Sequence, residues 1–347
     1  MILNKIHLSN FRNFGQASFK LDPLLTIVIG DNAQGKTNLL ESIYCLAYGV
    51  GFRESREEEL IKIKEKETLI EGNFSSDEGK KNLLILLRES HGQIEKKFFI
   101  NKTKKAFSSF QQETIKAILF SPGQIEIITG SPDERREYFN KLISSYDLEY
   151  RKKNIFYETA LRKRNKILEV HHDEEKLKEE LAFWDNYLEE QAVYIIKKRQ
   201  EYVDFLNKNQ KIDSQEFHIN YEKNPLTKKR LADYFYQEKK YRKTIIGPQK
   251  DDFIIFEKGN FDKDLHHFGS RSEQRLGIFW LKFNEIKYYL EKFKKKPIIL
   301  LDDIFSELDL KNKKLILRLM KNYQTIVTTA EPELLSLSRD SKSIIKL

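Results

Sequence analysis

Short apolar runs alternate with polar segments in the first part of this 347-residue chain. Apolar and polar residues alternate from Ile2 to Leu8, which predicts a half-buried strand, whereas the apolar run from Leu24 to Ile29 predicts a fully buried one. Residues 82–88 and 94–101 predict two further strands on either side of the turn at His91-Gly92-Gln93. This part of the chain is therefore expected to be rich in strands.

The pattern becomes helical in residues 146–210, where glycine and proline are absent and Leu, Lys and Glu recur at helical spacing. Helices are predicted over residues 150–170 and 175–209. The break between them, at residues 171–173, favours an antiparallel pair over one long rod. Aromatic and β-branched residues of the second helix are predicted to form its buried stripe, namely Phe183, Tyr187, Val193 and Tyr194.

Strand-like runs return towards the end of the chain, at residues 253–256, 298–301 and 326–329. Because the two outer parts share this pattern, we expect them to build one α/β head together. The predicted domains are a discontinuous head and a helical arm inserted into it: residues 1–145 with 245–347, and residues 146–244.

Charge and hydropathy narrow the class of protein. Lys and Arg number 62 and Asp and Glu 53, so the formal net charge is +9, which suits an anionic partner without identifying it. No apolar run approaches the ~18 residues of a membrane span, and the start of the chain lacks the pattern of a signal peptide. A cytoplasmic protein with no membrane partner is therefore expected.

Cysteine and histidine give no sign of a metal centre. The single cysteine, Cys45, excludes a disulfide scaffold and a C-x-x-C metal site, and its apolar neighbours predict a buried thiol. The histidines at 171–172 and 266–267 form adjacent pairs rather than the i, i+4 pairs of helical metal ligands. We interpret them as surface or linker residues.

Residues 30–37, Gly-Asp-Asn-Ala-Gln-Gly-Lys-Thr, match the phosphate-binding pattern G-x-x-x-x-G-K-[ST] between a predicted strand and a predicted helix. Glycines let the backbone curl so that N–H groups face phosphate oxygens, and the helix N-terminus adds its positive end. We expect Lys36 to reach the β- and γ-phosphates of ATP and the Thr37 hydroxyl to hold Mg²⁺. The loop residues expected to bind the nucleotide are Gly30, Asp31, Asn32, Ala33, Gln34, Gly35, Lys36 and Thr37.

The apolar strand predicted at residues 298–301 ends in two carboxylates, Asp302 and Asp303. Ligands bind at the carboxyl ends of buried parallel strands, so Asp302 is expected to hold Mg²⁺ through water and Asp303 to orient or activate the attacking water. A strand that ends in a solvated turn is the simpler alternative for this segment taken alone. The phosphate-binding loop favours the catalytic interpretation, and the long separation of Lys36 from Asp302 requires both chain ends to share one sheet.

Two further motifs flank the acidic strand. Residues 268–275 are Phe-Gly-Ser-Arg-Ser-Glu-Gln-Arg before a predicted helix, and residues 306–309 are Ser-Glu-Leu-Asp. The order of these motifs resembles the ABC-type ATPases, which sandwich ATP between two heads. In that group the S-x-x-E-Q segment is the signature, so the resemblance implies that five residues act in trans on the γ-phosphate held by the other subunit: Ser270, Arg271, Ser272, Glu273 and Gln274.

A closer resemblance covers nearly the whole chain. Stretches similar to the RecF family of bacterial DNA replication and repair ATPases occur in order along the sequence. They begin with Leu8-Ser9-Asn10-Phe11-Arg12-Asn13-Phe14 and continue at residues 30–44, 51–53, 130–136, 164–165, 183–185, 246–252 and 300–309. The resemblance implies an ABC-type ATPase head, with a P-loop sheet, helices and a β-rich lobe, into which the helical arm is inserted.

The same resemblance implies an ATPase that uses ATP and Mg²⁺, with Lys36 and Asp303 in the catalytic machinery and Gln124 as a sensor of Mg²⁺ and water. Asn38 and Arg12 join the expected nucleotide-binding residues. ATP binding is implied to drive homodimerisation and to clamp double-stranded DNA near gaps or junctions, with RecO and RecR as partners that help to load RecA. Slow DNA-dependent hydrolysis then acts as a switch that releases the clamp, without nuclease activity.

DNA binding of this kind is mainly to phosphates, so it depends on salt and not on base sequence. A basic cluster around a predicted hairpin turn offers weak candidate contacts: Lys102, Lys104 and Lys105. An ordinary solvated face is the alternative interpretation of this cluster.

Three departures from the family pattern leave alternatives open. Ser272 stands where the signature usually has glycine, and Gln249-Lys250 stand where the family usually has His-Arg. Pro122-Gly123-Gln124 stand where the family usually has Pro-Glu-Asp. A non-enzymatic DNA scaffold with a degenerate ATP site is one alternative, which the intact phosphate-binding loop and acidic pair argue against. A transporter ATPase subunit would place its signature much closer to that loop, and a long-armed chromosome-organising or zinc-hook ATPase would have a longer arm.

Overall fold

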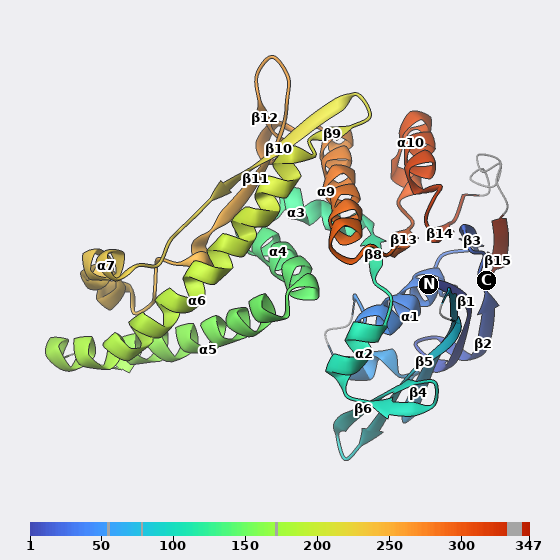
Figure 1. Ribbon diagram of the computed structural model, residues 1–347, viewed down its shortest axis with the longest axis horizontal. Coiled ribbons are helices and arrows are strands. Elements are labelled where there is room, and N and C mark those ends of the chain that lie inside the picture. The colour runs from blue at the N-terminus through green and yellow to red at the C-terminus, as the bar shows by residue number, and fades with distance from the viewer. Residues whose placement is uncertain (54–55, 78, 171–172, 332–341) are drawn as a thin grey trace. The chain divides into compact units, whose positions relative to one another are not determined.

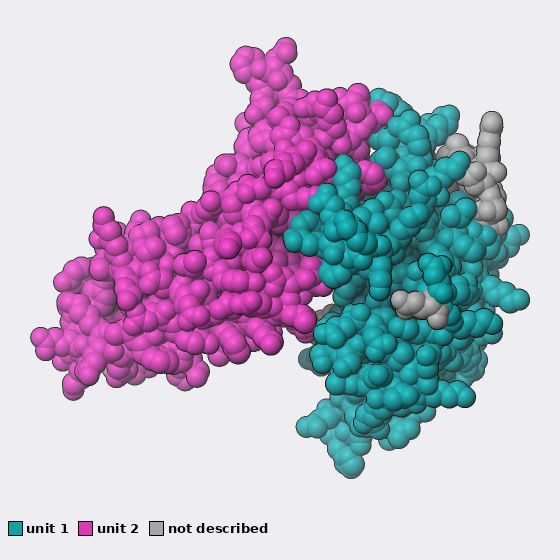
Figure 2. Space-filling model, in the orientation of Figure 1, with its two compact units in different colours: residues 1–122, 285–347 teal, residues 123–284 magenta. Residues whose placement is uncertain are grey.

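The computed structural model describes the chain apart from residues 54–55, 78, 171–172 and 332–341. The described residues divide into two compact units, residues 1–122 with 285–347 and residues 123–284 (Figure 2). The second unit is longer than the predicted arm. The difference arises because helix α4 (Pro132–Tyr146) and strand β11 (Asp252–Glu257) pack with elements of the arm.

The first unit contains a parallel sheet to which both ends of the chain contribute, as predicted (Figure 1). Its strands lie in the order β15 (Lys342–Lys346), β3 (Leu25–Ile29), β14 (Thr325–Thr329), β13 (Ile298–Asp302) and β8 (Ala117–Phe120). Leu300 of β13 pairs in register with Leu119 of β8 and Ile326 of β14. Strands β8, β13 and β14 are buried along their whole length, which explains their apolar and β-branched sequences.

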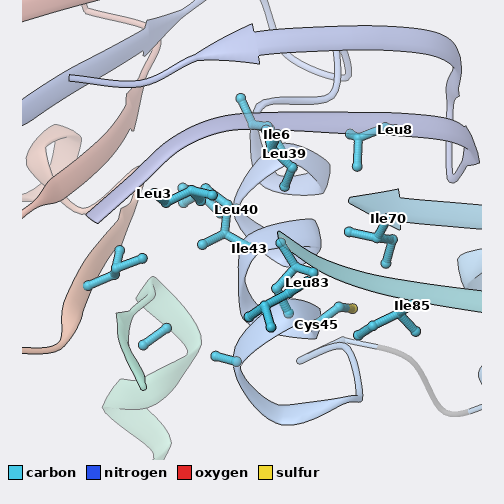
Figure 3. Close-up of a cluster of buried hydrophobic side chains, with 14 of the residues drawn as sticks. Leu3, Ile6, Leu8, Leu39, Leu40, Ile43, Cys45, Ile70, Leu83 and Ile85 are labelled. Atoms are coloured by element: carbon cyan, nitrogen blue, oxygen red, sulfur yellow. The ribbon is translucent and has the colours of Figure 1, made fainter. Parts of the chain in front are cut away.

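An antiparallel sheet forms the β-rich lobe of the first unit. Its strands lie in the order β2 (Phe14–Lys20), β1 (Ile2–Phe11), β4 (Glu67–Ser76), β5 (Gly79–Ser90), β6 (Gln93–Ile100) and β7 (Thr103–Lys105). Residues of this sheet, including Leu3 and Ile70, share a core with Leu40 of helix α1 (Lys36–Tyr48) (Figure 3). Cys45 of α1 is buried in this core, as predicted. The unit also contains η1 (Glu57–Leu60), α2 (Phe107–Glu113), η4 (Phe305–Glu307) and α10 (Leu310–Met320).

Helices α5 (Leu148–Val170) and α6 (Glu174–Lys208) form the predicted antiparallel pair in the second unit (Figure 1). Their contacts run in opposite directions along the chain, since Asp147 meets Tyr194 whereas Arg164 meets Asp185. His171 and His172, at the predicted break, lie outside the described residues.

A small antiparallel sheet packs with α6 in the order β12 (Lys263–Asp264), β11, β10 (Gln215–Glu222) and β9 (Lys211–Ile212). Helix α9 (Arg271–Phe293) begins in the second unit and ends in the first. The second unit also contains α3 (Glu126–Thr129), α7 (Lys228–Tyr241), η3 (Pro248–Lys250) and α8 (Leu265–Phe268), and η2 (Pro122–Ile125) lies at its start.

The stripe predicted for α6 is wrong. Phe183 and Val193 are 64% and 61% exposed, and Tyr187 and Tyr194 are only partly buried. The helix instead buries a face at a spacing of three or four residues that includes Leu177, Leu181, Leu188, Ala192, Ile195, Tyr202, Val203 and Leu206. Helix α5 and strand β10 cover this leucine-rich face. The aromatic residues of the sequence did not indicate which face of α6 these elements would cover.

Candidate nucleotide-binding site

The phosphate-binding loop connects the end of β3 with the start of α1. Gly35 has a φ of 106°, which strains any other residue, and a Cβ there would also lie 2.7 Å from the end of the Asn13 side chain. Lys36 folds over the loop, where its Nζ donates to the carbonyl oxygens of Gly30 at 2.8 Å and Asp31 at 3.0 Å. Four loop residues are exposed, which leaves the loop open to a ligand: Asp31, Asn32, Ala33 and Gln34.

The parallel sheet brings Thr37 of α1 to Asp302, the last residue of β13. Thr37 Oγ1 donates to Asp302 Oδ1 at 2.9 Å, although the residues are 265 positions apart. Burial raises the pKa of Asp302, and hydrogen bonds from Thr37 and Thr328 oppose that shift. Hydroxyl and carboxylate oxygens are ligands that Mg²⁺ prefers, so this pair fits a Mg²⁺ site.

Asp303 follows directly after β13 and has a φ of 50°, in the left-handed region that Asp tolerates better than most residues. Its N–H donates to Thr328, at 3.2 Å to the carbonyl oxygen and 3.0 Å to Oγ1. Strands β3, β14 and β13 are parallel neighbours, so the phosphate-binding loop after β3 and the acidic pair after β13 lie at the same carboxyl end of the sheet. The structure therefore brings together the predicted loop, the predicted metal-binding residues and Asp303.

Sequence reasoning missed Glu41, which is fully buried on α1. Arg12 Nε and Nη2 donate to its two carboxylate oxygens at 2.8 and 3.0 Å, and Arg53 Nη2 reaches it at 3.2 Å. Arg12 Nη1 also lies 3.8 Å from Glu59. Arg12 is thus held by carboxylates, and its contact with nucleotide stays a prediction. An acidic residue within an otherwise apolar helix was the signal that could have indicated this ion pair.

The turn between β1 and β2 lies against the phosphate-binding loop. Asn13 Nδ2 donates to the Gln34 carbonyl oxygen at 3.2 Å, and Asn38 Nδ2 donates to Asn13 Oδ1 at 2.7 Å. Asn38 Oδ1 also accepts a hydrogen bond from Arg53. Asn38 therefore supports the loop from beside it, and its direct contact with nucleotide stays a prediction.

The signature segment lies at the amino end of α9. Ser270 N–H donates to Glu273 Oε2 at 2.8 Å, and Glu273 N–H donates to Ser270 Oγ at 3.4 Å, which is the reciprocal pattern of a capping box. Ser270, Arg271 and Ser272 are exposed, whereas Gln274 is buried and donates to the Leu265 carbonyl oxygen at 2.9 Å. The contact of Gln274 with a nucleotide in trans stays a prediction.

Two predictions concern residues of the second unit. Gln124 is partly buried in η2, shortly after β8, and its role as a sensor of Mg²⁺ and water stays a prediction.

The second prediction concerns the histidine pair at 266–267. His266 Nδ1 lies 2.6 Å from the Ile128 carbonyl oxygen, and His267 is exposed. In the described part of the chain, no three His, Cys, Asp or Glu side chains are grouped to hold a metal ion.

The basic cluster surrounds a hairpin turn between β6 and β7, as predicted. Asn101 and Lys102 occupy the turn with φ values of 49° and 69°. Lys102 and Lys104 are exposed, whereas Lys105 lies 3.6 Å from Glu113 in an ion pair. Two of the three lysines are therefore presented to solvent.

Two sequence motifs meet inside the second unit. Arg135 donates to both carboxylate oxygens of Asp252, at 2.7 and 2.9 Å. The neighbouring Asp251 is buried and accepts a 2.6 Å hydrogen bond from Arg199 Nη1, while Arg136 donates to its carbonyl oxygen at 2.7 Å. Packing within the unit thus gives a role to four residues of the stretches 130–136 and 246–252: Arg135, Arg136, Asp251 and Asp252. Arg199, on a predicted helix, was not identified from the sequence.

Comparison with known proteins identifies the family. The chain matches the RecF/RecN/SMC N-terminal domain over residues 2–346. The DNA replication and repair protein RecF of Clostridium beijerinckii (strain ATCC 51743 / NCIMB 8052) is 32% identical over 360 residues, which cover 99% of this chain and 95% of that protein. The chain belongs to the RecF family.

Solved structures agree with membership of the RecF family. The recombination mediator protein RecF-ATPrS of the RecFOR pathway matches with a TM-score of 0.84 and 28% identity, over 99% of this chain and 95% of that one. An SMC head bound to the C-winged helix domain of ScpA matches with a TM-score of 0.55 and 17% identity, over 97% and 92% of the two chains, which shows a likeness of fold. This RecF-family chain therefore has the fold of an ABC-type ATPase head. Within its described residues, every helix is too short or too polar to cross a membrane.

Proposed function

We propose that this chain is a DNA replication and repair ATPase in which bound ATP closes a homodimer on DNA. The observation that carries the proposal is the 2.9 Å hydrogen bond between Thr37 Oγ1 and Asp302 Oδ1, which joins the phosphate-binding loop to the acidic strand. A relative of known structure, solved as RecF-ATPrS, supports ATP as the nucleotide. Hydrolysis in this proposal is DNA-dependent and resets the dimer.

The residues of the site have separate roles in the proposal. Lys36 exchanges the carbonyl oxygens of Gly30 and Asp31 for the β- and γ-phosphates. Thr37 and, through water, Asp302 would hold Mg²⁺, which would supply positive charge to offset that of the phosphate oxygens. Asp303 accepts a hydrogen bond from the attacking water and orients it. Gln124 senses the same water.

The dimer in the proposal is completed by the signature segment. Ser270, Arg271 and Ser272 are exposed at the amino end of α9, where backbone N–H groups and the helix dipole favour an anion. They contact the γ-phosphate held by the second copy, with Glu273 fixing the helix start through Ser270. Each copy then completes the other's site, so affinity for ATP and affinity for the second copy are linked.

DNA in the proposal is a duplex next to a single-strand gap, with RecR and RecO as partners and loading of RecA as the result. The name recombination mediator protein of the RecFOR pathway, borne by the 28% identical relative, supports these partners. Lys102 and Lys104 supply phosphate contacts from the exposed hairpin turn. Such contacts weaken as salt rises and do not read base sequence.

Sedimentation tests the proposal directly. The mass of the chain is measured without nucleotide, with ATP, and with ATP plus gapped duplex DNA. We expect dimerisation to require ATP and to strengthen with DNA, and we expect Lys36→Ala to abolish it. Lys20→Ala, which replaces an exposed lysine of β2, is the matched control and should behave as the unchanged protein. A monomer under all three conditions would contradict the sandwich mechanism.

A further inference from the structure

Thr328 contacts both acidic residues of the site through one hydroxyl. It lies in β14, where it pairs in register with Asp302 of β13, and its side chain is 0% exposed. Its Oγ1 donates to Asp302 Oδ1 at 2.9 Å and accepts from the N–H of Asp303 at 3.0 Å. The alternative acceptor, the Leu301 carbonyl oxygen, is farther away at 3.5 Å.

These two bonds fix different features of the acidic pair. The bond to Asp302 sets the orientation of the carboxylate. The bond from Asp303 stabilises a backbone with a φ of 50°, which Asp adopts less readily than glycine does. The turn at Asp303 and the carboxylate of Asp302 are therefore tied to the same buried atom.

The role of Thr328 differs from that of Thr37, which donates to the same Oδ1. Thr37 would also offer its hydroxyl oxygen to Mg²⁺, so its orientation would depend on the ion as well as on Asp302. Thr328 is on a buried strand and has no such alternative ligand, so it continues to orient Asp302. Removing a hydrogen bond of this kind from a metal-binding carboxylate typically lowers metal affinity or activity.

We propose that Thr328 is a positioning residue of the Mg²⁺–ATP site, and this inference rests on the proposed function. Its hydroxyl holds the carboxylate of Asp302 and the backbone of Asp303 in a fixed position relative to each other. Thr328→Val preserves the shape of the side chain and removes both hydrogen bonds. Thr328→Ser removes a methyl group and keeps them.

The test measures binding of a fluorescent ATP analogue, first in EDTA and then as Mg²⁺ is added. Thr328→Val should bind the analogue in EDTA as the unchanged protein does, but should need about 10-fold more Mg²⁺ for half of the magnesium-dependent gain. Thr328→Ser should retain the normal response. Thr325→Val is the matched control, because Thr325 is a buried threonine of the same strand whose hydroxyl contacts the Tyr323 carbonyl oxygen at 3.2 Å.

A second measurement uses the nucleotide-free protein. Hydrogen exchange in a peptide covering residues 298–306 should be faster in Thr328→Val, because the N–H of Asp303 loses one of its two acceptors. A normal magnesium response in folded Thr328→Val, or an equal shift in Thr325→Val, would overturn the inference. A shifted response in Thr328→Ser would do so even if the valine variant did not fold. An unchanged protein that binds no nucleotide would overturn the proposed function and this role together, whereas normal binding with an unshifted Thr328→Val would overturn this role alone.

Discussion

Arg12 and Glu41, a residue of the helix that follows the phosphate-binding loop, form a two-point ion pair with hydrogen bonds of 2.8 and 3.0 Å. Arg12 occupies the turn after β1 with a φ of 52°, and Glu41 is fully buried on α1. The pair joins the β-rich lobe to the helix that begins with Lys36. The same turn carries Asn13, which contacts the loop through the Gln34 carbonyl oxygen. The position of the loop therefore depends on an ion pair outside the phosphate-binding motif.

Glu41→Gln should destabilise the first unit by about 3 kcal/mol, because it leaves the Arg12 guanidinium without its buried carboxylate. Urea denaturation followed by circular dichroism measures the loss. Glu58→Gln is the control, since Glu58 forms an exposed ion pair with Arg56 and its removal should change the free energy of unfolding by less than about 1 kcal/mol. Equal stabilities for the two variants would show that the Arg12–Glu41 pair does not hold the lobe to α1.

The sequence predicted the elements that carry the site because their signals are local. The apolar run before Gly30 and the run before Asp302 are typical of buried parallel strands, and the glycine pattern marks the loop between strand and helix. These features depend on neighbours along the chain. The same reasoning placed Cys45 in the core correctly.

The sequence did not predict the contacts that depend on neighbours far along the chain. Glu41 and Thr328 acquire their roles from Arg12 and from Asp302, and no short motif records those pairings. The buried face of α6 was missed for the same reason, since Phe183 has helical spacing but the covering elements lie on the opposite side. Pairings of this kind follow from tertiary packing and override local pattern.

His218 should make the second unit less stable in mild acid. Burial lowers the pKa of His218 below its ordinary value of 6.5, although Asp262, 3.4 Å away, raises it and Lys258 lowers it further. The unfolded chain therefore binds a proton more readily than the folded one. The stability that this difference contributes is fully present above the unfolded pKa and is lost as the pH falls from there through the lower folded pKa.

The measurement for His218 is thermal unfolding between about pH 7.5 and about pH 5.5, across the range in which histidine titrates. His218→Gln should show a shallower fall in Tm with acidification than the unchanged protein. His91→Asn, at an exposed turn with a φ of 52° that asparagine tolerates, should keep the normal slope. An unaltered slope in His218→Gln would assign the acid sensitivity to other groups.

Asp303→Asn should separate ATP binding from hydrolysis. Asparagine tolerates the φ of 50° and keeps the N–H that Thr328 accepts, so the turn should stay in place. The amide is a poor acceptor for a proton from water, so the rate of hydrolysis should fall about 100-fold. ATP-dependent dimers should persist and accumulate in sedimentation.

The control for Asp303→Asn is Asp22→Asn, which keeps the Oδ1 that accepts from the N–H of Leu24 at 2.8 Å. Its phosphate release should match that of the unchanged protein. Normal hydrolysis by Asp303→Asn would show that Asp303 does not orient the attacking water. Asp302 and Gln124 would then be the candidates for that role.

Mixed dimers test whether the signature acts in trans. Lys36→Ala removes the lysine of the phosphate-binding loop, and Ser270→Arg places a bulky cation on the exposed amino end of α9. Each variant alone should be inactive as an ATPase. A mixture should regain activity, because one composite site of the mixed dimer combines an intact loop from one copy with an intact signature from the other. Ser270→Arg also removes the cap of α9, which should lower the free energy of unfolding by about 1 kcal/mol. Thermal unfolding of this variant is therefore measured together with its activity. Two inactive, folded variants whose mixture stays inactive would indicate that Ser270 serves the site of its own copy or only caps α9.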